Sequence, residues 1–271
     1  VIFLSLSQVN TNRFNKNKLL VELQGSIESQ VSAILNKEVA DRIGKRVTLL
    51  YPNNELGHSY LDEFWNQANV NGFELIETSG FEKGINDFRV AIGKLSGIEY
   101  TREKEKEYRE LVKQYKKEEK NVDEIEILKP TLEYNWVFIP SFPKEALQII
   151  PSFKYLGIKD INFVGGPSWK SRSLFSRKKY LENVNFVTDI EGPRKNEFVS
   201  NYKNSMGMMP KLLETLGYDS IYLAHQILSN DNSTRKELGE FLMSKNRLNS
   251  FLSEWQSEQN LWLKRMKIEK L

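Results

Sequence analysis

Short apolar runs alternate with amphipathic segments over much of the chain. Five of these runs are rich in β-branched and aromatic residues and predict buried strands: Arg46–Tyr51, Phe73–Thr78, Leu132–Pro140, Ile161–Val164 and Asn185–Ile190. In the segments between them, apolar residues recur every three or four positions, which predicts helices that pack on a sheet. Strands and helices therefore alternate, and this order predicts an α/β fold with a parallel sheet covered by helices on both faces.

The segment from Lys45 to Leu95 shows this pattern most clearly. Its first strand ends at Pro52-Asn53-Asn54, and a helix begins near Leu56-Gly57. The positions of that helix expected to face the core are Tyr60, Leu61, Phe64, Trp65 and Ala68. A second strand follows Asn71-Gly72, so the segment predicts one βαβ unit.

The two ends of the chain follow the pattern less regularly. Val1–Ser7 predicts a strand, and one helix is expected over about Gly25–Ile43, with Gly44 as its stop. From Gly192 onward the pattern is mostly helical, with a final strand expected within Leu261–Leu271.

Composition removes several classes of function. The chain has no cysteine, which excludes disulfides, thiolate metal sites and cysteine nucleophiles. Its 39 basic and 36 acidic residues nearly cancel, a bias too weak to predict nucleic-acid binding. No apolar run approaches the length that crosses a bilayer. His58 and His225 each lack a second metal ligand at helical spacing, and no catalytic motif is found, so we expect no metal, no cofactor and no enzyme activity.

Several motifs of the Lys45–Leu95 segment together resemble a known family. They are Tyr51-Pro-Asn-Asn54, the Gly57 that opens the helix, Asn71-Gly72 before the next strand, and Asp87-Phe88-Arg89. In this order they resemble the second lobe of type I periplasmic binding proteins, which deliver amino acids and similar solutes to transporters. Phe64-Trp65 and Asp87-Phe88-Arg89 are typical of one branch of that superfamily, the penicillin-binding-protein activators.

The resemblance implies two Rossmann-like lobes with parallel sheets flanked by helices, the first lobe being only partly present. Residues 1–43 and 192–271 would belong to the first lobe and residues 44–191 to the second, with a charged helical insertion at about 99–130. We expect the N-terminal part of a longer protein to be missing, so that another segment or chain would cover apolar helix faces of the first lobe. The implied location is the periplasm, either free or anchored to the outer membrane through a lipid carried upstream.

The candidate ligand-binding residues follow from the predicted sheets. In open α/β sheets, ligands bind beyond the carboxyl ends of the strands. The residues that lie there, with help from the resemblance, are Ser5, Ser7, Gln8, Asn54, Leu56, Ser141, Phe142, Gly166 and Trp169. A structural role explains some of them equally well, since the serines can close a strand-end turn and Trp169 can belong to the core.

The sequence departs from amino-acid receptors of this fold at one informative place. Those receptors usually carry a Tyr just before the Gly that opens the helix, and here Leu56 precedes Gly57. In addition, Gly166 and Pro167 stand where an acidic group would hold an α-ammonium. An ammonium in a cleft needs a carboxylate or several carbonyl oxygens to offset its desolvation, so a simple amino-acid ligand is not favoured.

Thr101–Lys120 is a dense mixture of Lys, Arg and Glu with a narrow apolar seam. It predicts either a solvated helix or hairpin packed by that seam, or a docking surface for a protein partner that includes Tyr108, Arg109 and Tyr115. Two functions remain open. The charged segment and the Leu at position 56 favour the first, an activator that regulates a peptidoglycan synthase by contact. The alternative is the substrate-binding component of an ABC transporter for amino acids or other small polar solutes.

Overall fold

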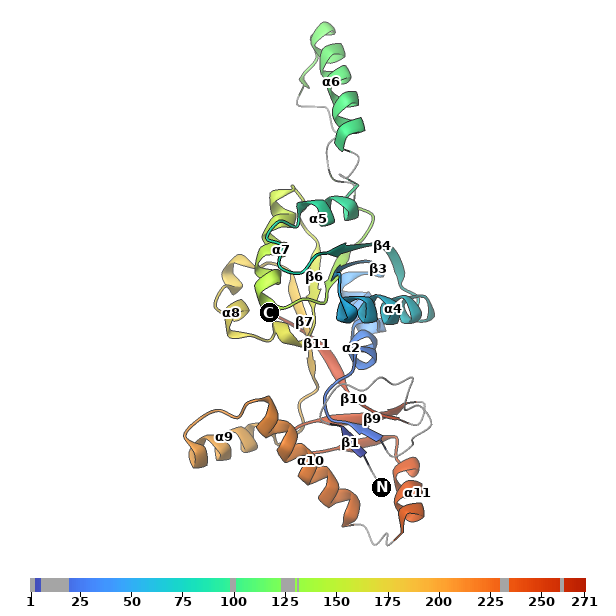
Figure 1. Ribbon diagram of the computed structural model, residues 1–271, viewed down its shortest axis with the longest axis vertical. Helices are drawn as coiled ribbons and strands as arrows, with labels where there is room; N and C mark the ends of the chain where they lie inside the picture. Colours follow the sequence, from blue (N-terminus) through green and yellow to red (C-terminus); the bar gives the residue numbers. More distant parts are fainter. Residues whose placement is uncertain are drawn as a thin grey trace. The chain divides into compact units, whose positions relative to one another are not determined.

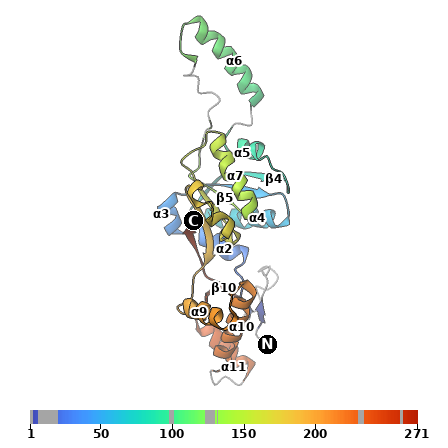
Figure 2. The same cartoon turned by 90° about the vertical axis from the view of Figure 1, so that its left-hand side faces the viewer.

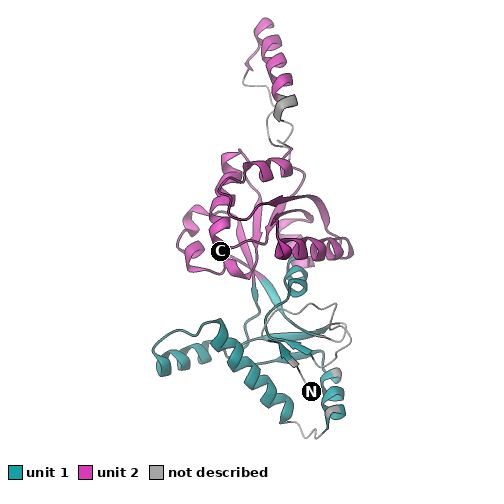
Figure 3. Cartoon of the chain, in the orientation of Figure 1, with its two compact units in different colours: residues 1–34, 188–267 teal, residues 35–187, 268–271 magenta. Residues whose placement is uncertain are grey.

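The computed structural model describes residues 3–5, 20–97, 101–122, 130, 132–229, 234–258 and 261–271 (Figure 1). The chain forms two compact units. Unit 1 consists of residues 1–34 and 188–267, and unit 2 of residues 35–187 and 268–271 (Figure 3). The chain therefore passes between the units three times. The lobe boundaries predicted at 43/44 and 191/192 stay a prediction.

Unit 2 is built on a six-stranded sheet with the order β11-β7-β6-β5-β3-β4. The strands are β3 Arg46–Pro52, β4 Glu74–Phe81, β5 Trp136–Ile139, β6 Asn162–Gly165, β7 Val184–Asp189 and β11 Met266–Lys270. The five neighbouring strands β7, β6, β5, β3 and β4 are parallel to one another. β11 runs antiparallel to β7, because Leu271 N–H bonds Val184 O while Ile190 N–H bonds Arg265 O. The parallel sheet predicted from the alternating pattern is confirmed.

Helices cover both faces of this sheet (Figures 1 and 2). They are α3 Lys37–Ile43, α4 Glu55–Val70, α5 Arg89–Leu95, α7 Pro143–Tyr155 and α8 Arg172–Phe175, with the 3-10 helices η2 Pro167–Trp169 and η3 Lys178–Tyr180. Unit 2 also contains α6 Thr101–Lys117, which does not cover the sheet. α5, α7 and α8 share one core with Leu50, Val137 and Phe163 of the sheet. α4 packs on the other face, where Phe64 contacts the rings of Trp136 and Phe138.

Unit 1 has a smaller, mixed sheet with the order β1-β2-β10-β9-β8. The strands are β1 Phe3–Ser5, β2 Leu20–Glu22, β8 Arg247–Asn249, β9 Glu254–Glu258 and β10 Leu261–Lys264. β1, β2 and β10 are parallel, and β8 and β9 extend the sheet antiparallel. The helices of this unit are α2 Ile27–Ile34, α9 Lys195–Met206, α10 Leu212–Leu228 and α11 Arg235–Ser244. The core joins α10 and α11 to the sheet around Trp255 and Trp262.

Three expectations about these elements were wrong in detail. Trp65 is exposed, because the buried stripe of α4 is the narrower set Tyr60, Phe64 and Ala68. The single helix expected over Gly25–Ile43 is interrupted, because the Asn36 side chain accepts a bond from Val39 N–H and starts a new helix. The C-terminal part contains β8 and β9 as well as helices, and its tail forms two strands.

Candidate functional site

The carboxyl ends of three neighbouring strands meet at one edge of unit 2. β6, β5 and β3 are adjacent and parallel, so the segments that follow them lie side by side. Six of the predicted ligand-binding residues belong to these segments: Asn54, Leu56, Ser141, Phe142, Gly166 and Trp169. This is the edge at which α/β sheets bind ligands, and it is the candidate functional site.

After β3, the chain turns sharply into α4. The Asn54 side chain caps the helix by accepting a 2.8 Å bond from Gly57 N–H. A Cβ at position 57 would lie 1.9 Å from the carbonyl oxygen of Pro52, so only Gly permits this close approach. Leu56, in the first turn, keeps 38% of its surface exposed. Asn54 is thus occupied as a cap, whereas Leu56 presents an apolar side chain at the edge.

After β5, a buried serine is followed by an exposed aromatic ring. The backbone oxygen of Ser141 accepts bonds from Ser168 Oγ at 3.1 Å and from Trp169 Nε1 at 2.9 Å. Phe142 stands at the start of α7, where its N–H donates to the Glu145 carboxylate at 2.7 Å, and 62% of its surface is exposed. Because its backbone is held by this bond and its ring is free, Phe142 is a rigid apolar contact point.

Trp169 joins the ends of β5 and β6. Its ring lies on the backbone of Gly165, where a Cβ would approach a ring carbon to 1.9 Å, and the side chain is fully buried. Gly166, which follows the strand, is also buried. In this structure Trp169 therefore positions the edge through Ser141 and does not present a ring to solvent. Ser168, which bonds Ser141 from the same turn, was not among the predicted residues.

The other predicted ligand-binding residues belong to unit 1. Ser5 ends β1 and is in register with Glu22 of β2. Ser7 and Gln8 lie outside the described residues. Glu22 itself was not predicted, although a carboxylate within the apolar run Leu19–Leu23 is a visible sequence signal. Its role as a ligand contact, like that of the serines, stays open.

Glu22 is a buried carboxyl, only 2% exposed. Its Oε2 accepts a 3.4 Å bond from Ser29 Oγ, and its Oε1 has no hydrogen-bond partner among the described residues. Burial raises the pKa of Glu22 to about 7, against the lowering effect of hydrogen bonds from Ser26. Glu22 therefore exchanges its proton close to neutral pH.

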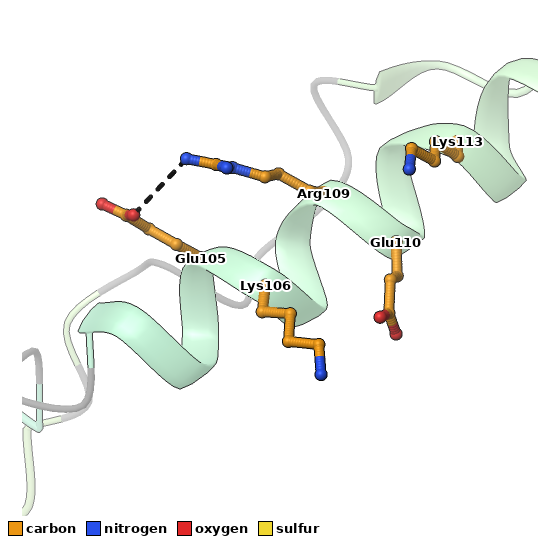
Figure 4. Close-up of a pocket in the computed structure, with 5 residues that line it drawn as sticks. All are labelled: Glu105, Lys106, Arg109, Glu110 and Lys113. Carbon is orange, nitrogen blue, oxygen red and sulfur yellow. Dashed lines mark ion pairs between the residues drawn. The ribbon is translucent and has the colours of Figure 1, made fainter.

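The predicted partner-binding residues lie on α6. Tyr108 and Tyr115 are half-buried, and Arg109 is exposed with its Nη2 3.8 Å from Glu105 Oε2. A hollow on this helix is lined by Glu105, Lys106, Arg109, Glu110 and Lys113 (Figure 4). All five side chains come from one helix and project from two sides of it, so the hollow is open surface and not an enclosed pocket.

Two further features were searched for in the described part of the chain. No group of three His, Asp or Glu side chains there could hold a metal ion. None of the described helices has the length and hydropathy needed to cross a membrane.

Neither a protein-family model nor a curated protein matches the sequence. Solved structures do resemble it. The isoleucine-bound substrate-binding protein of a branched-chain amino acid transporter from Streptococcus pneumoniae has a TM-score of 0.58 and 16% identity, over 100% of this chain and 69% of its own. A leucine-binding protein from Thermotoga maritima has a TM-score of 0.61 and 15% identity, over 100% of this chain and 70% of its own. The third is a solute-binding protein of an ABC transporter from Rhodopseudomonas palustris, in complex with 3,4-dihydroxybenzoic acid. It has a TM-score of 0.55 and 14% identity, over 100% of this chain and 68% of its own.

The chain has the type I periplasmic-binding-protein fold. The resemblance drawn from its motifs is thus confirmed at the level of the fold, with two sheets of mostly parallel strands flanked by helices. At 14–16% identity the similarity carries no further than the fold. The three solved structures named above are binding proteins.

Proposed function

We propose that this protein is the substrate-binding component of an ABC transporter and that it binds a small polar solute at the carboxyl edge of unit 2. The observation that carries the proposal is the convergence of three strand ends, with Leu56 and Phe142 exposed beside polar backbone. Three solved proteins of the same fold bind isoleucine, leucine or 3,4-dihydroxybenzoic acid. A periplasmic location goes with this function.

The composition of the edge narrows the class of solute. Leu56 and Phe142 offer apolar surface, which favours a solute with an aliphatic or aromatic portion. Gly166 and Pro167 follow β6, so this strand end offers no carboxylate to an α-ammonium. A solute whose polar groups are carboxylate or hydroxyl oxygens fits this edge better than a simple amino acid does.

Calorimetric titration with branched-chain amino acids, aromatic carboxylic acids and short peptides tests the proposal. Truncating Phe142 removes apolar surface that the solute would cover, so Phe142→Ala should weaken binding at least about tenfold. Tyr155→Ala is the matched control, because Tyr155 is an exposed aromatic residue at the opposite end of α7. Equal affinity of the Phe142→Ala variant and the native protein would place the solute elsewhere. The absence of a heat of binding for every compound tested would contradict solute binding.

The activator function rests on the sequence motifs and on the mixed-charge helix α6. Solved structures of similar fold support the transporter function better, because they are solute-binding proteins. Capture of a peptidoglycan synthase that is lost in Tyr108→Ala and Tyr115→Ala variants would favour the activator function instead.

A further inference from the structure

The segment from Lys170 to Tyr180 carries a concentrated positive charge. It contains Lys170, Arg172, Arg177, Lys178 and Lys179 and no acidic residue. The whole chain has 39 basic and 36 acidic residues, so removing these five leaves 34 against 36. These eleven residues, which include α8 and η3, carry a net charge of +5. We call this stretch the cationic segment.

Three of its charges have no ion pair in the described part of the chain, unlike those of some other exposed bases of unit 2. Arg46 lies within 3.2 Å of the Glu74 carboxylate, and Lys154 within 3.0 Å of that of Glu182. In contrast, Arg172, Arg177 and Lys178 have no carboxylate partner among the described residues, and all three are exposed. Unpaired cations at this density repel one another and attract a partner with many negative charges.

Two aromatic rings stand among these cations. Phe175 is 45% exposed, and its ring centroid lies 5.9 Å from that of Phe186 in the sheet, in an edge-to-face arrangement, while Tyr180 is 66% exposed. Lys179 Nζ lies 4.7 Å above the ring of Tyr180. Leu174, which lies between Arg172 and Arg177 in the chain, is fully buried and attaches the segment to the core of unit 2. The segment thus combines basic side chains with half-exposed rings on a rigid support.

We propose that the cationic segment binds the surface of a membrane that contains anionic phospholipids. Aromatic rings favour the boundary between headgroups and acyl chains, and basic side chains favour anionic headgroups. An acidic protein partner would match the charge alone, whereas a bilayer matches both the charge and the exposed rings. This inference does not depend on solute binding, because the segment and its partner can be tested with no solute present.

Co-sedimentation of the full chain with vesicles tests the inference directly. Binding is expected to vesicles of phosphatidylcholine mixed with phosphatidylglycerol, but not to phosphatidylcholine alone, and to fall steeply with salt. Each basic residue near such a surface contributes about fivefold in affinity. The variant with Arg172, Arg177, Lys178 and Lys179 all changed to Gln should therefore bind at least about 100-fold more weakly.

A matched control is offered by α6. Changing Lys106, Lys113, Lys116 and Lys117 to Gln removes the same number of exposed positive charges, but from a helix with four interleaved Glu residues. This variant should keep binding within about threefold, and circular dichroism should show both variants folded. Equal losses in the two variants, binding to phosphatidylcholine alone, or binding to polyglutamate without binding to anionic vesicles would each overturn the inference.

Discussion

The two units bury charge very differently. Unit 2 has a core of aromatic and aliphatic side chains, and its buried polar residues in the described part of the chain are uncharged: Thr48, Ser79, Ser96, Ser141 and Asn185. Among its described residues, unit 1 buries Glu22, Asp219 and Lys264, whose side chains are ionisable. The parallel strands of unit 2 reach eight residues and the inner ones are buried on both faces, whereas the strands of unit 1 have three to five residues.

Polar contacts join elements of unit 1 that are distant in the chain. The Asp219 carboxylate on α10 accepts bonds from Ser250 Oγ and from Leu252 N–H, which ties the helix to the turn between β8 and β9. Lys264 Nζ of β10 pairs with Asp189 Oδ2 at 2.9 Å. Buried charges of this kind are costly to leave unpaired. The comparison therefore predicts that packing governs the stability of unit 2, and that protonation and ion pairing govern the stability of unit 1.

The largest expected effect concerns the packing of unit 2. Trp169→Ala removes a fully buried indole and its bond to the Ser141 carbonyl, and should lower the free energy of unfolding by about 3–5 kcal/mol. Trp65→Ala is the control, since Trp65 is an exposed tryptophan of the same unit, and it should cost no more than about 0.5 kcal/mol. Urea unfolding followed by circular dichroism measures both. A Trp169→Ala variant with native stability and no solute binding would assign the ring to the solute instead of the core.

A smaller effect, specific to unit 1, depends on pH. The pKa of Glu22 in the folded protein is about 7, above its ordinary value of 4.5, because burial disfavours the charged form. The folded state therefore holds the proton more tightly, and this stabilisation is complete below pH 4.5 and lost as the pH rises through 7. Glu22→Gln, which mimics the protonated form, should remove about 2–3 kcal/mol of pH dependence from the free energy of unfolding.

Unfolding free energies of the native protein and of the Glu22→Gln variant, measured from pH 4.5 to 8, check this prediction. The two curves should meet at the acidic end and separate towards the alkaline end, with the variant more stable there. Parallel curves would mean that Glu22 is charged in the folded protein across this range.

The sequence predicted unit 2 well, for a physical reason. Strands such as Trp136–Ile139 are apolar throughout, and α7 repeats its buried residues at helical spacing, so local pattern and tertiary structure agree. The site edge was predictable in the same way, because Asn54 and Gly57 show the cap and the sharp turn in the sequence itself. Pattern alone misjudged Trp65, since an amphipathic stripe does not show how wide its buried face is.

Unit 1 was harder to predict because its contacts are distant in the chain. β8 spans only Arg247–Asn249 and pairs with a strand whose outward residues are polar, so neither shows a long apolar run. The burial of Glu22 arises from β2, the start of α2 and β10 together, and Trp255 Nε1 bonds its carbonyl oxygen from β9. No single stretch of sequence contains that environment.

The smallest expected effect is that of Ile221→Gln on the exposed face of α10, the main helix of unit 1, with Leu223→Gln on its buried face as the reference. Ile221 is 73% exposed, whereas Leu223, two residues further along, is fully buried in the core. Leu223→Gln should lower the free energy of unfolding by about 2–4 kcal/mol, because it loses apolar contacts and buries an amide. Ile221→Gln should change it by no more than about 0.5 kcal/mol, since the side chain already faces water. If thermal and urea unfolding show that Ile221→Gln costs more than about 1 kcal/mol, another polypeptide covers this face in solution, and unit 1 depends on apolar burial as unit 2 does.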